Sequence, residues 1–463
     1  MRAGRNPQDS ASSAAATSVG ILPPGPRGHR LRNFYRRLSG YSEFMEQLHE
    51  DYGDIVFFEL PFMKCCAVFD PDLAQEILVA QSPSFAPWAL GGREPNKLME
   101  YGCLPVHHGE EHRWRSELMK TAFAGDRLEA YAEVIAEQAL KLRARLRPEQ
   151  VIDLRPEVER YTWDALTRVV LGRDVDGRHG LHIGRLLKAA DLLDLLPFGQ
   201  LLKKLGPKPP TAVLDEAIHD AIRRGRDPIH DGRDLVSHLV RAAGQGRSEW
   251  SYPNNRALRD EVIAFLCAFT DAPTATLCFA FHHLGRNPVA RERAEREVAD
   301  VLGGRSMEPA DFDRLPYVQA VFKETLRLEP PAYVMRAKEA LEDRVVGGYR
   351  IPKGTLAYVG MRVLHHRVEY WERAGEFRPE RWLDDSQTEG PPCPAHAYIP
   401  FGSGPHGCAG ADLAAMLFVF ALAAIIERLR LEPRSSRPPK RENIGVCVDR
   451  LRVTVEERAR GDR

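Results

Sequence analysis

Apolar residues recur every three to four positions along most of the chain, a spacing that gathers them on one face of a helix. This pattern predicts helices over residues 72–79, 111–122, 127–146, 157–171 and 260–284. Two shorter stretches, 54–60 and 64–69, predict a hairpin around Pro61, and further short strands are predicted near 344–360 and in the last twenty residues. The chain is therefore predicted to be mainly α with small β-sheets.

The start of ordered structure is predicted at residues 22–26, because consecutive prolines lack N–H donors and fix φ. Residues 1–20 are polar and rich in small side chains, which predicts a disordered tail, with an organelle transit peptide as the alternative. Length alone would suit two or three domains, but a single domain over 21–463 is predicted.

Charge and apolar content narrow the class of protein. The 65 basic and 65 acidic residues cancel, so no net field favours binding to nucleic acid. The longest apolar run, 413–426, is 14 residues long, shorter than the roughly 20 that a membrane-crossing helix needs. No transmembrane anchor is therefore predicted. The eight cysteines form no C-x-x-C pair, which favours a reducing compartment.

One cysteine has an unusual setting. Residues 401–410 read FGSGPHGCAG, and four glycines and a proline in ten residues let the backbone approach a flat ligand closely. Cys408 lies just before the apolar run, and the N-terminal amides of a helix there would stabilise a thiolate. A buried thiolate needs a cation, which a haem iron would supply; the alternative is an inert thiol in a turn.

The spacing F-x-x-G-x-x-x-C-x-G resembles the haem-binding signature of the cytochrome P-450 family. Its fixed positions are occupied by Phe401, Gly404, Cys408 and Gly410. The resemblance covers residue 22 to the C-terminus and implies the cytochrome P-450 fold and haem b (iron protoporphyrin IX). It makes Cys408 the iron ligand, places Phe401, Gly402 and Gly410 beside the haem, and puts His406 where an Arg or His meets a haem propionate.

Two further motifs resemble the family in the expected order. Residues 323–327 carry E-x-x-R and residues 377–382 resemble its P-E-R-F/W segment. The resemblance implies that Glu324, Arg327 and Arg381 form a buried triad that braces the cysteine loop. Taken alone, the E-x-x-R pair would be read as a solvated pair on one helix face.

Two more segments resemble regions that contact the haem propionates. In residues 329–336 the family's pattern makes Arg336 a propionate ligand, with a solvated arginine as the alternative. Residues 108–115 resemble the helix over the proximal haem face, where His112 takes the place of the usual Trp or His. The arginine expected four residues after His112 is Ser116, and Arg113 or Arg115 is the alternative for this contact.

The central helix departs from the family at the oxygen site. The family pattern A/G-G-x-D/E-T-T aligns with Ala268, Phe269, Thr270, Asp271, Ala272 and Pro273. The acid is present at Asp271, but the alcohol is replaced by Ala272. Pro273 lacks an N–H and would free the carbonyl of Phe269, although it could simply bend the helix. We hypothesise that Asp271, Thr270 and freed carbonyls near Ala268 order the water that delivers protons, or that a substrate hydroxyl does so.

The resemblance implies a monooxygenase that acts on a small apolar substrate, as in secondary metabolism. The substrate would be contacted from regions 85–104, 186–205 and 332–334. The residues expected in this pocket are Trp88, Leu90, Tyr101, Leu104, Phe269, Ala332, Tyr333 and Val334. Most of these side chains would also suit a plain apolar core.

The sequence after the last strands leaves no room for a reductase domain, so a ferredoxin and its reductase are the expected electron donors. Arg113, Arg115 and Lys120 are candidates for docking such an acidic carrier. The expectation is a monomeric, cytoplasmic, soluble enzyme of bacterial type. The departure at Ala272 keeps two alternatives open: a haem-thiolate isomerase, dehydratase or peroxygenase that needs no reductase, and a non-catalytic haem-binding protein.

Overall fold

The computed structural model describes residues 20–26, 28–88, 103–176, 211–245, 252, 254–335, 337–383, 393–439, 448 and 450–458. The chain divides into two compact units, each built from separate stretches of sequence. The sheet unit consists of Met1–Trp88, Tyr333–Trp371 and Pro392–Gly407. The helical unit consists of Ala89–Ala332, Glu372–Pro391 and Cys408–Arg463.

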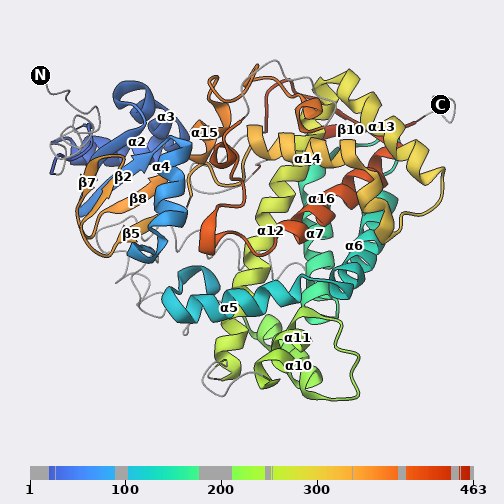
Figure 1. The fold of residues 1–463 in the computed structure, drawn as a ribbon. Coiled ribbons are helices and arrows are strands. Elements are labelled where there is room, and N and C mark those ends of the chain that lie inside the picture. The colour runs from blue at the N-terminus through green and yellow to red at the C-terminus, as the bar shows by residue number, and fades with distance from the viewer. Residues whose placement is uncertain are drawn as a thin grey trace, which may run out of the picture. The chain divides into compact units, whose positions relative to one another are not determined.

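The sheet unit is built on five strands in the order β1-β2-β8-β5-β3, in which β8 runs parallel to β2 and the other pairs are antiparallel (Figure 1). The predicted hairpin is confirmed, since its two strands pair from Ile55 with Val68 to Leu60 with Met63. The elements are α2 (Arg30–Ser39), α3 (Tyr41–Tyr52), β1 (Ile55–Leu60), β2 (Met63–Val68), α4 (Pro71–Gln75) with a π-helical turn (Glu76–Ala80), β3 (Phe85–Pro87), β5 (Lys338–Ala340), the β6–β7 hairpin (Arg344–Val346, Tyr349–Ile351), β8 (Leu356–Val359) and α15 (Met361–His366).

Both faces of this sheet are buried. Successive side chains of a strand point to opposite faces, and in β2 the apolar side chains of each face pack into a separate cluster. In β2, Cys65 and Ala67 pack into one apolar cluster with α3, whereas Cys66 and Val68 pack into another with the helical turns after Asp70. Burial raises the pKa of Cys65 to about 12. These adjacent cysteines are therefore inert core residues.

The helical unit confirms the predicted helices from residue 111 onward. Its helices are α5 (Gly109–Ala122), α6 (Asp126–Arg145), α7 (Leu154–Leu171), α10 (Ala212–Arg226), α11 (Leu235–Gln245), α12 (Asn255–Arg286), α13 (Pro288–Leu302), α14 (Pro316–Leu328) and α16 (Ala411–Ile426). A small antiparallel sheet, β4-β10-β9, joins Val151–Asp153, Arg452–Glu457 and Leu429–Pro433.

The long helix α12 runs through this unit beside α7, α14 and α16 (Figure 1). It begins at a capped end, where the Asn254 side chain accepts hydrogen bonds from the N–H groups of Arg256 and Ala257 at 2.9 and 3.0 Å. Among the described residues it is the helix long and apolar enough to cross a membrane, but most of its apolar window is buried inside the fold. We therefore describe it as a core helix.

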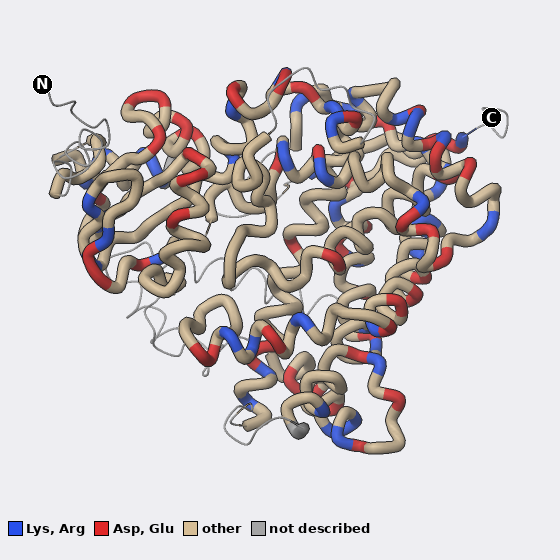
Figure 2. The backbone as a smooth tube through the Cα atoms, viewed as in Figure 1, with Lys and Arg blue, Asp and Glu red and all other residues tan. Residues whose placement is uncertain are grey.

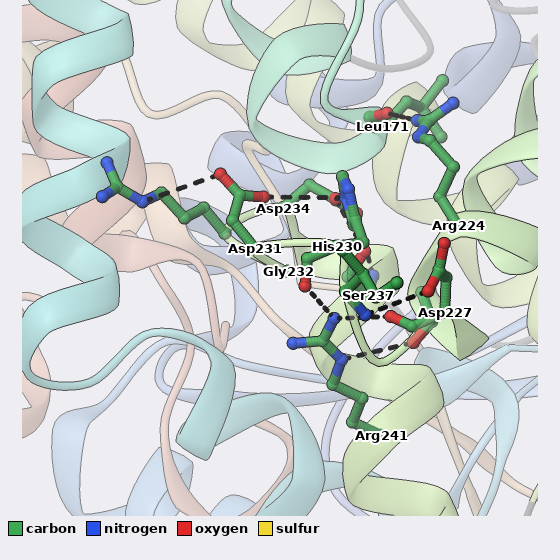
Figure 3. Close-up of polar contacts among 12 residues, drawn as sticks. Leu171, Arg224, Asp227, His230, Asp231, Gly232, Asp234, Ser237 and Arg241 are labelled. Carbon is green, nitrogen blue, oxygen red and sulfur yellow. Dashed lines mark hydrogen bonds and ion pairs between the residues drawn. The ribbon is translucent and has the colours of Figure 1, made fainter.

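The turn between α10 and α11 is closed by side-chain hydrogen bonds (Figure 3). Arg241 donates to the carbonyl of His230 at 2.6 Å, and Asp234 accepts from the Ser237 hydroxyl at 2.7 Å and from its N–H at 2.8 Å. A nucleophilic serine needs a base such as histidine to take its proton. Because the Ser237 hydroxyl is bonded to Asp234 instead, this cluster is a cap for α11.

Candidate active site

The segment before Cys408 is shaped by backbone bonds and by one buried histidine. The N–H of Ile399 donates to Nε2 of His365, which is fully buried, at 3.0 Å. The N–H of Gly402 donates to the Ile399 carbonyl at 2.9 Å, and Gly402 and Gly404 have φ of 75° and 71°. Glycine suits these positions because other residues rarely adopt such angles. Sequence reasoning missed His365, since no motif marks it.

The sulfur of Cys408 is prepared for a cationic partner. The residue is solvent-accessible, yet the surrounding protein desolvates its thiol and raises its pKa, a shift that the backbone N–H of Gly410 partly opposes. Gly410 is also the N-cap of α16, so the sulfur lies near the positive end of a helix of 16 residues. These are the surroundings of a thiolate that binds a metal ion such as haem iron.

The surface of Gly410 accepts a flat ring. A Cβ built on Gly410 would lie 1.7 Å from Cζ of Phe269, so only glycine fits against this ring. Phe269 also stacks on Phe265 of the same helix, with ring centroids 4.4 Å apart. The Cys408 sulfur would hold a haem iron, and Gly410, which the Phe269 ring covers in this structure, leaves room for a flat group where a side chain would otherwise stand.

On α12, the predicted oxygen-site residues divide between two sides of the helix. Ala268 is exposed and Asp271 and Ala272 are partly exposed, whereas Phe269, Thr270 and Pro273 are buried. The helix continues without interruption through Pro273. Since proline has no N–H, the carbonyl of Phe269 lacks its usual donor four residues on. The accessible side therefore offers a carboxyl group and no hydroxyl.

The threonine hydroxyl groups of this helix bond to its own backbone, and one of them also contacts α7. Thr270 donates to the carbonyl of Leu266 at 2.7 Å, and Thr274 donates to the carbonyl of Thr270 at 2.7 Å. The Thr274 hydroxyl also lies 2.9 Å from that of Thr162 on α7. The Thr270 hydroxyl, expected to order water with Asp271, thus donates its proton to the backbone of its own helix. Nothing in the sequence indicated the Thr162–Thr274 pair, because the two residues are 112 positions apart.

Helix α5 corrects one expectation about charge. His112 is buried on this helix. Arg115 is only 2% exposed and pairs with Glu261 of α12 at 2.7 Å, so it cannot dock an electron carrier. Arg113 and Lys120 are exposed, but acidic residues alternate with them along the helix (Figure 2). The exposed face of α5 therefore carries both signs of charge.

The structure brings the predicted triad together. The Glu324 carboxylate accepts from Arg327 at 2.8 and 2.9 Å and from Nε of Arg381 at 3.1 Å. It also accepts from the indole N–H of Trp382 and the backbone N–H of Arg378, both at 2.9 Å. Glu324 and Arg327 are completely buried. Each partner lies in α14 or in the segment 372–382, so the contacts shown join those two elements.

The expected substrate residues belong to both units. Trp88 and Val334 pack on the same apolar cluster of the sheet unit, and the carbonyl of Tyr333, also in that unit, accepts from the N–H of Arg362 at 2.9 Å. Leu104, Phe269 and Ala332 lie in the helical unit. Phe401 and His406 lie in the sheet unit. The predicted site residues outside the described part of the chain are Leu90, Tyr101, Arg336 and the region 186–205.

Comparison with known proteins identifies the family of this chain. Residues 23–455 match the profile of the cytochrome P-450 family. The cyclooctat-9-en-7-ol 5-monooxygenase of Streptomyces melanosporofaciens is 28% identical over 88% of this chain and 87% of its own length. The beta-amyrin 24-hydroxylase of Glycine max is 26% identical over 88% of this chain and 85% of its own length. The fold, the haem b cofactor and the oxidoreductase class expected from the motifs are thereby confirmed, and the chain belongs to the cytochrome P-450 family.

Proposed function

We propose that this protein is a monooxygenase that inserts one oxygen atom of dioxygen into an apolar polycyclic small molecule. The observation that carries this proposal is the position of the Cys408 sulfur, two residues before the N-cap of α16, where the backbone N–H of Gly410 lowers its pKa against the effect of burial. A haem bound through such a thiolate supplies dioxygen activation, because sulfur donates electron density to iron. The substrate class is taken from the relatives, which are named for a cyclic alkenol and for beta-amyrin.

In this proposal Asp271 handles protons. Its carboxyl group lies on the accessible side of α12. The next residue, Ala272, occupies the position of the family's usual hydroxyl. The Phe269 carbonyl, which Pro273 leaves without its helical donor, is a second acceptor for water. Asp271 and this carbonyl would together order water beside the substrate, and Phe269 would limit the space left for it.

Electrons would come from a ferredoxin and its reductase, as for a soluble, monomeric, cytoplasmic enzyme of bacterial type. The support for this donor is the pair Arg113 and Lys120 on the exposed side of α5. The interspersed Glu110, Glu111 and Glu117 limit the strength of any attraction to an acidic carrier. Docking therefore has to include surface outside α5.

Turnover distinguishes the proposed monooxygenase from the reductase-independent alternatives that Ala272 leaves open. With cyclooctat-9-en-7-ol as the probe, we expect a shift of the Soret band on binding and a hydroxylated product with dioxygen, ferredoxin, its reductase and NAD(P)H. Product mass and oxygen labelling measure the outcome. Product from hydroperoxide alone, or rearrangement without oxygen uptake, would favour a peroxygenase or an isomerase. Haem binding with neither activity would favour a binding protein.

The proton role of Asp271 predicts a second result. We expect Asp271→Asn to lower turnover by roughly 100-fold, the lower end of what a positioned proton donor contributes. Thr270→Val is the matched control and should change turnover little, because the Thr270 hydroxyl is already bonded to the Leu266 carbonyl. Turnover and product formed per NAD(P)H are measured, with the carbon monoxide spectrum as the check on the haem site.

A gain of function at Ala272 would contradict this route. If Ala272→Thr greatly raised product per NAD(P)H, the added hydroxyl would be supplying a proton relay that the wild-type enzyme lacks. Asp271 and water would then not be an effective route. Equal loss of turnover in Asp271→Asn and Thr270→Val would contradict it as well, since both changes would then act through the packing of α12.

A further inference from the structure

A carboxylate on α12 holds the backbone of the segment that precedes α5. Glu261, only 3% exposed, accepts the N–H of Leu104 with both oxygens, at 2.9 and 3.1 Å. Leu104 begins a short helical turn, Leu104–Val106, which leads into α5. A carboxylate that accepts a backbone N–H makes a stronger bond than a neutral acceptor would. This bond fixes the turn to α12.

The charge of Glu261 is balanced by a buried arginine. Arg115 of α5 donates to Glu261 at 2.7 Å and to Glu111 at 2.8 and 3.2 Å. Its guanidinium also lies over the rings of Tyr252 and Trp114, 5.0 and 5.8 Å from their centroids. Burial raises the pKa of Glu261, whereas Arg115 and the Leu104 N–H lower it. A buried ion pair is favourable only with such complete pairing.

The position of this pair links it to the chemistry of the site. Asp271 follows Glu261 by ten residues in the same uninterrupted helix, which is about 15 Å along the helix axis. Leu104 is a predicted substrate contact, so one rigid helix carries both the proton-handling group and the anchor of a substrate contact. No motif of the family marks Glu261, and the resemblance at residues 108–115 does not connect Arg115 with Glu261.

We propose that Glu261, held by Arg115, is a positioning residue that sets Leu104 relative to Asp271 and thereby the size of ligand that the site accepts. The proposal rests on the proposed function, since that function assigns Leu104 to the substrate pocket. A positioning role differs from a purely structural one, because loss of the Glu261 anchor should weaken the binding of large ligands more than that of small ones. The pair therefore controls specificity and touches no reacting atom.

The test removes the anchor while keeping the fold. The double variant Arg115→Met with Glu261→Met replaces a buried ion pair by apolar side chains of similar size, which proteins commonly tolerate. Glu261→Gln keeps one oxygen for Leu104 and serves as the conservative variant. The matched control is Glu295→Gln, which alters another buried carboxylate, bonded to Arg430 at 3.0 Å and remote from Leu104 in sequence.

Two measurements are made on the full-length holoenzyme. The first is hydrogen exchange of the peptide containing Leu104, which should be slow in the wild type and in Glu295→Gln and fast in the double variant. The second is binding of imidazole and of the bulkier 4-phenylimidazole, followed by the Soret shift. We expect the double variant to weaken 4-phenylimidazole binding by roughly 10- to 100-fold, as for the loss of a hydrogen bond to a charged group. Imidazole binding should change little, and Glu261→Gln should give an intermediate result.

The outcomes separate this proposal from the proposed function. Unchanged exchange at Leu104, or equal weakening of both azoles with a lower Tm, would show that the pair is merely structural and overturn the inference. Failure of the wild type to bind either azole would count against the haem site instead, and the exchange result would still decide whether Glu261 anchors Leu104.

Discussion

Replacement of Cys408 by alanine is expected to remove the red-shifted Soret band of the reduced, carbon monoxide-bound protein and essentially all oxygenation. The reason is that the thiolate is both the iron ligand and the source of electron density for dioxygen activation. The Gly410 N–H and the N-terminus of α16 act on the charge of the sulfur, and alanine has no sulfur for them to act on. The measurements are the carbon monoxide difference spectrum, the haem content and the product yield.

Cys393→Ala provides the matched control for this change. Cys393 is also exposed and lies 15 residues earlier in the chain, outside the glycine-rich loop. We expect this variant to keep the wild-type spectrum and turnover. Retention of haem and of the red-shifted band in Cys408→Ala would show that another residue ligates the iron, and the functional proposal would fail with it.

Glu324→Gln is expected to lower the free energy of unfolding by roughly 3–5 kcal/mol, the usual cost of breaking a buried ion pair by changing one partner. The carboxylate meets two guanidinium groups, an indole N–H and a backbone N–H within the fold. The neutral amide removes the negative charge that faces the buried Arg327 guanidinium and turns one acceptor into a donor. Denaturant unfolding of the holoenzyme, followed by circular dichroism and by the Soret band, measures the change.

The same substitution on the surface separates burial from charge. Glu137 pairs with Lys141 and Arg168 but is half exposed, so Glu137→Gln should cost no more than about 1 kcal/mol. Correctly folded Glu324→Gln protein should keep the wild-type carbon monoxide spectrum and turnover per haem, since the triad is structural. A stable variant with altered chemistry would contradict that assignment.

Much of the architecture could be predicted because it depends on local patterns. The 3.6-residue period located α5, α6, α7 and α12 to within a few residues, and the hairpin around Pro61 followed from two short strands. The triad is brought together as the family's motif implies, since Glu324 and Arg327 share one helix face and residues 378–382 return to it. Local spacing and a specific motif were sufficient for these features.

The remaining features depend on which residues meet across long stretches of sequence. From the sequence, Arg115 is expected to be a surface docking residue. In the folded protein it is buried against Glu261, which lies 146 positions away in the chain. Likewise, Thr270 lies beside Asp271 in sequence but points its hydroxyl back into its own helix. Spacing identifies the residues of a helix face but does not say what that face meets in the folded protein.

The parallel pairing of β8 with β2 has a consequence for synthesis of the chain. The first two strands emerge early, but β8 is made about 290 residues after the end of β2, which takes a ribosome roughly 15–60 s. Throughout that interval β2 has one edge without its neighbour, and the parts of both apolar clusters that β5, β8 and α15 supply are not yet made. The nascent N-terminal segment is thus exposed to mispairing with other chains until β8 has been made.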